Sequence, residues 1–260
     1  MSRLPALFLS HGSPMHALQP GAVRAVWQGL ARELPRPKAI LIASAHWETD
    51  LPAVTAAARP ETIHDFYGFP QPLYEIQYPA AGDPALAEEV LRLLRKNDFN
   101  AAADPARGLD HGAWSPLLHM YPEADVPVVQ LAVQTHLGPA HHLALGRALA
   151  PLAAEGVLAI GSGHLTHNLR ERMREGGAPA GYVVRFQRWV ADRIAARDVD
   201  ALVDYRRLTP DGVRAHPTDE HFLPLFVALG AAGGHYRAER LYDAVEMGAL
   251  AMDAYRFDAA

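Results

Sequence analysis

The sequence contains no cysteine among its 260 residues. This absence excludes disulfide bonds, thiolate metal sites and cysteine nucleophiles, so any bound metal must be held by histidine, aspartate or glutamate. A chain without cysteine also fits a reducing compartment, and we expect a cytoplasmic protein.

Long hydrophobic runs are lacking as well. The apolar run at residues 6–9 is too short for a signal-peptide core or a bilayer span, and other runs are interrupted by glycine, proline or charge. Charged residues make up 20% and the net charge is −5, so nothing favours a nucleic acid or a membrane surface as a partner. We expect one catalytic domain over residues 1–260, and no pattern marks an oligomer interface.

Histidine, in contrast, is abundant, with 14 copies. Arginine- and alanine-rich chains commonly place histidines on their surface, and we expect this for five of them. These are His16, His119, His141, His142 and His235.

Short apolar runs alternate with helical patterns along the chain. Four runs dense in leucine, isoleucine or valine are typical of strands covered on both faces; they span residues 6–10, 39–45, 126–133 and 157–160. Apolar spacing of three to four predicts helices at 22–34, 85–94, 141–154, 182–196 and, in the tail, 243–255. Asp83 and Pro84 suit the cap and first turn of the second helix. This alternation predicts an α/β fold with a mostly parallel central sheet and helices on both faces.

The stretch at residues 60–82 is rich in proline, glycine and aromatic residues. Structureless loops of this length in a compact domain are usually functional or disordered, and the aromatic residues argue against disorder. We therefore expect a long loop that lies over another part of the molecule, with Phe66, Tyr67 and Phe69 available as walls for a flat ring.

A histidine follows each of the four predicted strands within a few residues. His11 follows the first and His46 the second, His136 follows the third, and both His164 and His167 follow the fourth. Because ligands collect at the carboxyl ends of parallel strands, these side chains are expected to converge at one edge of the sheet. Converging neutral imidazoles suit a divalent transition metal, so the metal site is predicted at this edge.

Three further histidines lie in turn-rich segments. His111 lies in the sequence GLDHG, and His216 and His221 lie in HPTDEHFLPL, where His221 directly precedes an apolar helix. His221 is a candidate third ligand delivered from far along the chain. Solvated turn or helix-start residues are equally good interpretations of His111 and His221 when each is taken alone.

Taken in order, these short motifs resemble a known family. They are SHGSP at 10–14, SAHW at 44–47, DFYGFP at 65–70, LDHG at 109–112, GSG at 161–163 followed by HN at 167–168, and HPTDEHFLPL at 216–225. The chain is similar to the class III extradiol ring-cleavage dioxygenases, specifically the 4,5-DOPA dioxygenase extradiol branch. The resemblance runs from residue 9 to about residue 225.

The resemblance implies a role for five histidines. His11, His46 and His221 would be the metal ligands, with His221 standing where more distant relatives use a glutamate. His167 would be the acid/base beside the metal, or a fourth ligand when zinc occupies the site. His111 would point into the pocket and interact with oxygen or with the substrate hydroxyl.

Two residues near His167, namely His164 and Asn168, receive different interpretations. His164 falls at a position that varies in the family, so the resemblance assigns it no role, whereas the strand-end rule alone does not choose between His164 and His167. Asn168 is a candidate to orient the imidazole of His167.

The chemistry of extradiol cleavage fits these residue types. A ferrous ion with three protein ligands retains open positions for a catecholate and for O₂. Three histidines in place of two histidines and a carboxylate make the site one charge more positive, and such an all-nitrogen set also suits zinc. The implied cofactor is thus one divalent metal, Fe(II) for ring cleavage, with Zn(II) possible in the isolated protein.

Two other functions use the same residues. A zinc hydrolase would activate water at this cluster and would work without oxygen. A non-enzymatic relative that binds protein partners would retain the metal site as a relic. The presence of His167 beside the three candidate ligands argues against the relic, because an inert site needs no base.

Overall fold

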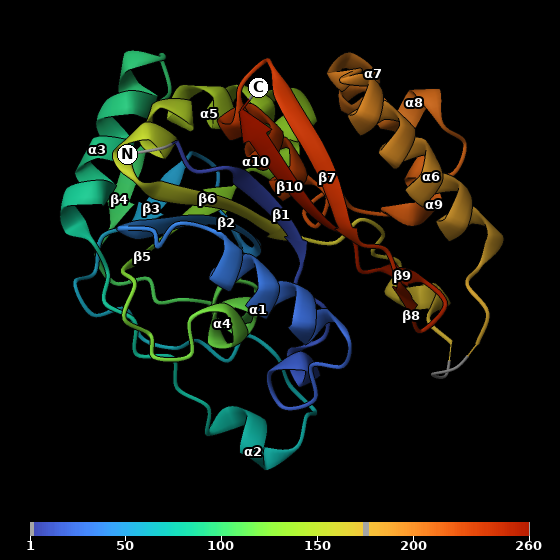
Figure 1. Cartoon of the computed structure of the whole chain (residues 1–260), viewed down its shortest axis with the longest axis horizontal. Coiled ribbons are helices and arrows are strands. Elements are labelled where there is room, and N and C mark those ends of the chain that lie inside the picture. The colour runs from blue at the N-terminus through green and yellow to red at the C-terminus, as the bar shows by residue number, and fades with distance from the viewer. Residues whose placement is uncertain (1–2, 174–176, 260) are drawn as a thin grey trace.

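The computed structural model describes residues 3–173 and 177–259 and is built around a central β-sheet (Figure 1). Within these residues the sheet has eight strands. In spatial order they are β4 (Ala102–Asp104), β3 (Ala53–Thr55), β5 (Val128–Val133), β2 (Ala39–Glu48), β6 (Val157–Gly163), β1 (Ala6–Ser10), β10 (Ala254–Ala259) and β7 (Tyr236–Tyr242). All four predicted strands are confirmed.

The centre of the sheet is parallel. β5, β2, β6 and β1 lie side by side in one direction, whereas β10 and β7 are antiparallel additions at one edge and β3 pairs with β5 in the antiparallel sense. The carboxyl ends of these four strands therefore lie along the same edge of the sheet. This arrangement confirms the predicted fold class and brings all four predicted histidine-bearing strand ends to one edge.

Helices cover both faces of the sheet (Figure 1). On one face α1 and α4 pack on Leu7 and Leu9 of β1, and on the other face α6 and α10 pack on Phe8, because successive side chains of a strand point to opposite faces. The helices are α1 (Val23–Glu33), α2 (Gln71–Tyr74), α3 (Pro84–Lys96), α4 (His111–Met120), α5 (Gly138–Leu149), α6 (Gly181–Ala196), α7 (Val199–Val203), α8 (Tyr205–Leu208), α9 (Gly212–Ala215) and α10 (Leu223–Ala232).

Local signals explain where several helices begin. The side chain of Asp83 accepts a hydrogen bond from the backbone N–H of Leu86, and Pro84 occupies the first turn of α3, as predicted. Asp110 caps α4 in the same way, so that His111 is the first residue of a helix. Among the described residues, no helix is both long enough and apolar enough to cross a membrane.

The helix predicted for residues 243–255 is wrong. This segment forms the hairpin β8 (Val245–Glu246) and β9 (Leu250–Ala251) and then enters β10. Met247 and Gly248 at the hairpin tip have φ angles of 48° and 66°, a left-handed pair that turns the chain back on itself. Pairing of β8 with β9, and of β10 with β1, overrides the helical spacing of this segment.

Helices α5 and α10 pack closely because glycines face each other between them. A Cβ atom on Gly146 would lie 2.2 Å from the carbonyl oxygen of Val227. We expect Gly146→Ala to lower the free energy of unfolding by about 1–3 kcal/mol, as overpacking of a core does. Chemical denaturation of the purified variant measures this. Gly29→Ala in α1 is the matched control, because a Cβ there meets nothing within 4 Å; equal stability of the two variants would contradict the prediction.

Candidate metal centre

Three histidines from separate parts of the chain place their Nε2 atoms close to one another. The Nε2 atom of His46 lies 3.1 Å from Nε2 of His11 and 3.3 Å from Nε2 of His221. His11 follows β1, His46 lies near the carboxyl end of β2, and His221 precedes α10. The ligand atoms of all three lie within 4.8 Å of one another, so this triad is able to hold a metal ion.

Each ring of the triad has an acceptor near its other nitrogen. Nδ1 of His11 lies 3.0 Å from Oγ of Ser162, and Nδ1 of His221 lies 3.1 Å from a carboxylate oxygen of Glu220. Ser162 in turn donates its hydroxyl proton to the carbonyl of Gly112, which leaves its oxygen free to accept. These contacts favour the proton on Nδ1 and leave Nε2 bare for a metal, as partners behind metal-binding histidines generally do.

The electrostatics of the triad favour neutral rings. Burial, and then the neighbouring imidazoles, hold the pKa values of His11, His46 and His221 well below the usual value for histidine. A divalent transition metal binds the neutral imidazole. The donor set therefore fits a divalent metal of the iron or zinc type.

His221 reaches the triad because α10 approaches β6 very closely. A Cβ atom on Gly163 would lie 2.1 Å from the carbonyl oxygen of His221, and the backbone N–H of His164 donates to that same oxygen over 2.8 Å. Only a glycine allows this approach. The contact joins residues far apart in the sequence, which is why spacing alone could not place His221.

His167 lies flat against a ring of the triad. Its ring is stacked on that of His221, with centroids 3.5 Å apart and planes at 14°. Burial, followed by repulsion from His111, lowers the pKa of His167 to about 4, so the ring is a neutral proton acceptor near pH 7. The expected help from Asn168 is wrong, because its amide bonds the carbonyl of Arg214 and the carboxylate of Glu171 instead.

His111 stands beside the triad and is held by a residue that sequence reasoning missed. Its ring centroid lies 4.0 Å from that of His46. The carboxylate of Asp65 lies 2.8 Å from Nδ1 of His111 and 3.4 Å from Nδ1 of His46. Asp65 belongs to the aromatic loop, and the only signal for it was the prediction that this loop covers another part of the molecule.

His164 also lies beside the triad. The residue is buried, its ring centroid lies 5.0 Å from that of His11, and its Nε2 accepts a hydrogen bond from the backbone N–H of Gly12. This bond ties the loop after β1 to the end of β6. Both strand-end histidines of β6 thus enter the site, in different positions.

The histidines open onto a cavity of about 490 Å³. It is lined by the triad with His111, His164 and His167, and by Phe66, Tyr67 and Phe69 of the aromatic loop. Leu169, Arg172, Met247 and Leu250 also line it. A cavity that combines candidate metal ligands with aromatic side chains suits a small flat ring.

The histidine that follows β5, His136, does not belong to the site. His136 lies in the short 3₁₀ turn Thr135–Leu137 after β5 and is exposed, because the chain turns there directly into α5. The surface placement expected for His16, His119 and His142 is wrong, since all three are buried and hydrogen-bonded. Their ring nitrogens form hydrogen bonds inside the protein. His235 is exposed, as expected.

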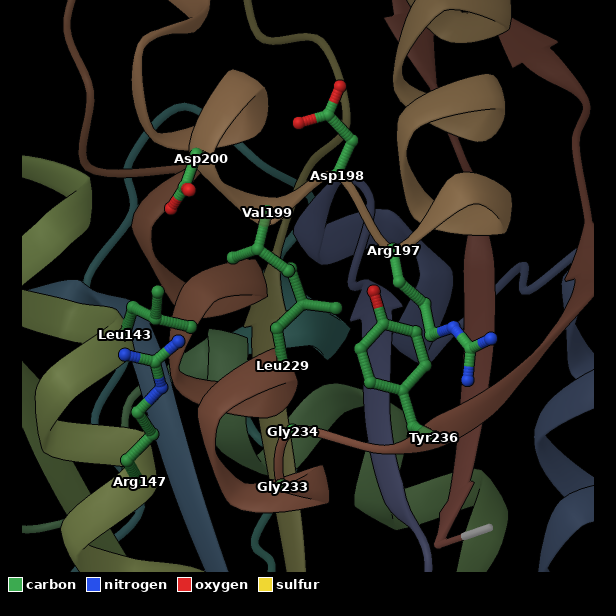
Figure 2. Close-up of a pocket in the computed structure, with 10 residues that line it drawn as sticks. All are labelled: Leu143, Arg147, Arg197, Asp198, Val199, Asp200, Leu229, Gly233, Gly234 and Tyr236. Atoms are coloured by element: carbon green, nitrogen blue, oxygen red, sulfur yellow. The ribbon is translucent and has the colours of Figure 1, made fainter.

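A second cavity, of about 240 Å³, lies between α5, α10 and the start of α7 (Figure 2). It shares no lining residue with the histidine cavity. Its charged side chains are Arg147, Arg197, Asp198 and Asp200, which carry both signs. No group able to hold a metal was found there within the described residues.

The chain matches a described protein family over almost its whole length. Residues 5–252 match the catalytic LigB subunit of aromatic ring-opening dioxygenase, and the chain belongs to this family. Members of this family are metal-dependent enzymes that open aromatic rings.

Two individual relatives and one solved structure are similar to almost the whole chain. A 4,5-DOPA dioxygenase extradiol from Beta vulgaris is 44% identical, covering 96% of this chain and 95% of the relative. The protein of the same name from Escherichia coli K12 is 42% identical, covering 96% and 93%. A crystal structure of an uncharacterized protein from Escherichia coli K12 has a TM-score of 0.84 at 36% identity and covers 98% of this chain and 99% of that one. The resemblance seen in the short motifs is confirmed.

Proposed function

We propose that this protein binds one ferrous ion through His11, His46 and His221 and cleaves a DOPA-like catechol in extradiol fashion with O₂. The observation that carries the proposal is the convergence of three Nε2 atoms, at 3.1 and 3.3 Å from one another, in a cavity that aromatic side chains also line. The substrate class is taken from the names of the relatives.

The bound ion supplies open coordination positions for the catechol oxygens and for O₂. Around it, the protein's own residues bind and move protons. His167 takes the second catechol proton and later returns a proton to the oxygen atom that leaves when the O–O bond breaks, a role suited to an imidazole that is neutral near pH 7. His111 contacts the oxygen or the substrate hydroxyl, and the aromatic loop holds the ring flat.

Two carboxylates support this assignment of a three-histidine site. A ligand set without a carboxylate leaves the site one charge more positive than the usual set of two histidines and a carboxylate. Glu220 lies behind His221, and Asp65 lies behind His46 and His111. Their negative charge would offset part of the extra positive charge of the site, and neither carboxylate would act as a metal ligand.

Reconstitution tests the proposal directly. The metal-free protein is loaded anaerobically with Fe(II), a panel of catechols that includes DOPA is added, air is admitted, and oxygen consumption is followed. We expect uptake of one O₂ for each ring opened and a yellow product, because both oxygen atoms enter the ring-opened molecule.

The zinc-loaded protein is the control, and no oxygen uptake is expected from it because zinc has no redox chemistry. Absence of uptake with every catechol, in samples shown to contain iron, would refute the proposal. Hydrolysis by the zinc form under anaerobic conditions would instead favour a zinc hydrolase.

A further inference from the structure

We infer that Asp65 is a positioning residue that keeps the ring proton of His111 on Nδ1, so that His111 presents a bare Nε2 to the substrate. The inference about proton placement follows from geometry alone. Its consequence for catalysis rests on the function proposed above.

The carboxylate of Asp65 holds His111 at two points. One oxygen accepts the backbone N–H of His111 over 2.9 Å, and the other lies 2.8 Å from ring Nδ1. Two contacts from one carboxylate to one residue fix both the position and the rotation of the ring. His111 is 96% buried, which leaves the ring little freedom to turn away.

The surroundings of Asp65 make it an acceptor. One of its oxygens accepts the backbone N–H of His111, and the other lies 2.8 Å from Nδ1 of His111 and 3.4 Å from Nδ1 of His46. A carboxylate whose two oxygens both face nitrogens accepts hydrogen bonds from them. The proton between Asp65 and His111 therefore belongs to Nδ1.

The opposite nitrogen of His111 remains available to the cavity. Among the described residues, Nε2 of His111 has no hydrogen-bond partner, and His111 lines the cavity next to the triad. With Nδ1 protonated, Nε2 of the neutral ring carries a lone pair and is an acceptor. A catechol hydroxyl at the metal would donate to it.

The same contact anchors the aromatic loop. Phe66 follows Asp65 and lies edge-on against the ring of His111, with centroids 5.6 Å apart. The backbone amide that Asp65 accepts is the first of helix α4, an amide with no partner inside the helix. Asp65 thus connects the cavity wall to the residue that faces the substrate, and its removal affects both.

The proton position is measurable without any reaction. In ¹⁵N-labelled, zinc-loaded protein, two- and three-bond ¹⁵N–¹H correlations distinguish the two neutral forms of each histidine ring, and loss of signals in His111→Asn assigns this ring. We expect His111 with the proton on Nδ1. A proton on Nε2 would overturn the inference, and this result needs no variant of Asp65.

The variant Asp65→Asn tests the consequence. An amide oxygen can still accept the backbone N–H, but the amide NH₂ then faces Nδ1 and favours the proton on Nε2. The corresponding change in the serine-protease triad lowers kcat by about 10⁴, and we expect a loss of about 10²–10⁴ in kcat here, with KM changed only a few-fold. Because Asp65 also lies behind His46, the variant is assayed with excess Fe(II) and kcat is expressed per bound iron. Asp65→Glu, which retains the carboxylate, should recover part of the loss.

Glu75→Gln is the matched control, because it removes one negative charge from the same loop at an exposed position. It should retain the kcat of the unchanged enzyme and the Nδ1 proton of His111. If Asp65→Asn retains kcat as well, or loses kcat with the proton still on Nδ1, the inference fails. If the enzyme without substitutions consumes no oxygen, the proposed function is refuted. The ¹⁵N–¹H correlations of the His111 ring would still decide where its proton lies.

Discussion

Replacing His167 by alanine is expected to lower kcat by about 10²–10⁴, the usual contribution of a positioned acid/base. The expected loss follows from the neutral ring of His167, whose pKa burial lowers to about 4, stacked at 3.5 Å on the ring of His221. Metal content should stay nearly unchanged, because the three converging Nε2 atoms belong to other residues. Steady-state oxygen uptake, together with metal analysis of the same sample, measures both quantities.

The exposed His235 provides the control, since His235→Ala removes an imidazole far along the chain and should retain full activity. Added imidazole should restore part of the rate to His167→Ala by entering the vacated space. Complete loss of metal from His167→Ala would reassign His167 as an essential ligand. An unchanged kcat would remove it from the mechanism.

Replacing His46 by alanine is expected to abolish metal binding and activity together. His46 is central to the triad, with its Nε2 atom 3.1 Å from His11 and 3.3 Å from His221. Changes behind a metal ligand already cost about 10–100-fold in affinity, so we expect loss of the ligand itself to weaken affinity by more than about 100-fold. Competition with a chromophoric chelator measures this for Fe(II) and for Zn(II).

His136→Ala is the matched control, because His136 also follows a strand of the sheet but is exposed and outside the triad. It should bind metal as tightly as the unchanged protein does. Equal affinities for the two variants would show that the metal is held elsewhere. Thermal unfolding of both variants without metal checks that neither substitution disrupts the fold.

The position of two ligand candidates was predictable from local pattern alone. A short apolar run is buried in almost any arrangement of the chain, so the strands that precede His11 and His46 were recognisable without any knowledge of their neighbours. The carboxyl ends of parallel strands share an edge, and both residues do lie in the triad. His221 required the motif resemblance, since its approach depends on Gly163 lying under the start of α10.

Other residues depended on the order of the strands and on the path of the loops. His136 fulfils the same local rule as His11 but is excluded, because the chain leaves β5 directly into α5. No sequence pattern indicated Asp65, yet its carboxylate contacts the ring of His111, 46 positions further along the chain. Residues 243–255 have helical spacing but form strands, because β8 pairs with β9 and β10 pairs with β1.

By itself, the sequence determined the α/β class, the central strands and a histidine-rich edge, because burial of apolar runs and their period are local properties. Only the tertiary structure decided which histidines meet, which carboxylates lie behind them and which ring nitrogens remain bare. These outcomes depend on contacts between residues far apart in the chain, such as Asp65 with His111 and Gly163 with His221. Such contacts leave no periodic trace in the sequence, so they appear only when the chain is folded.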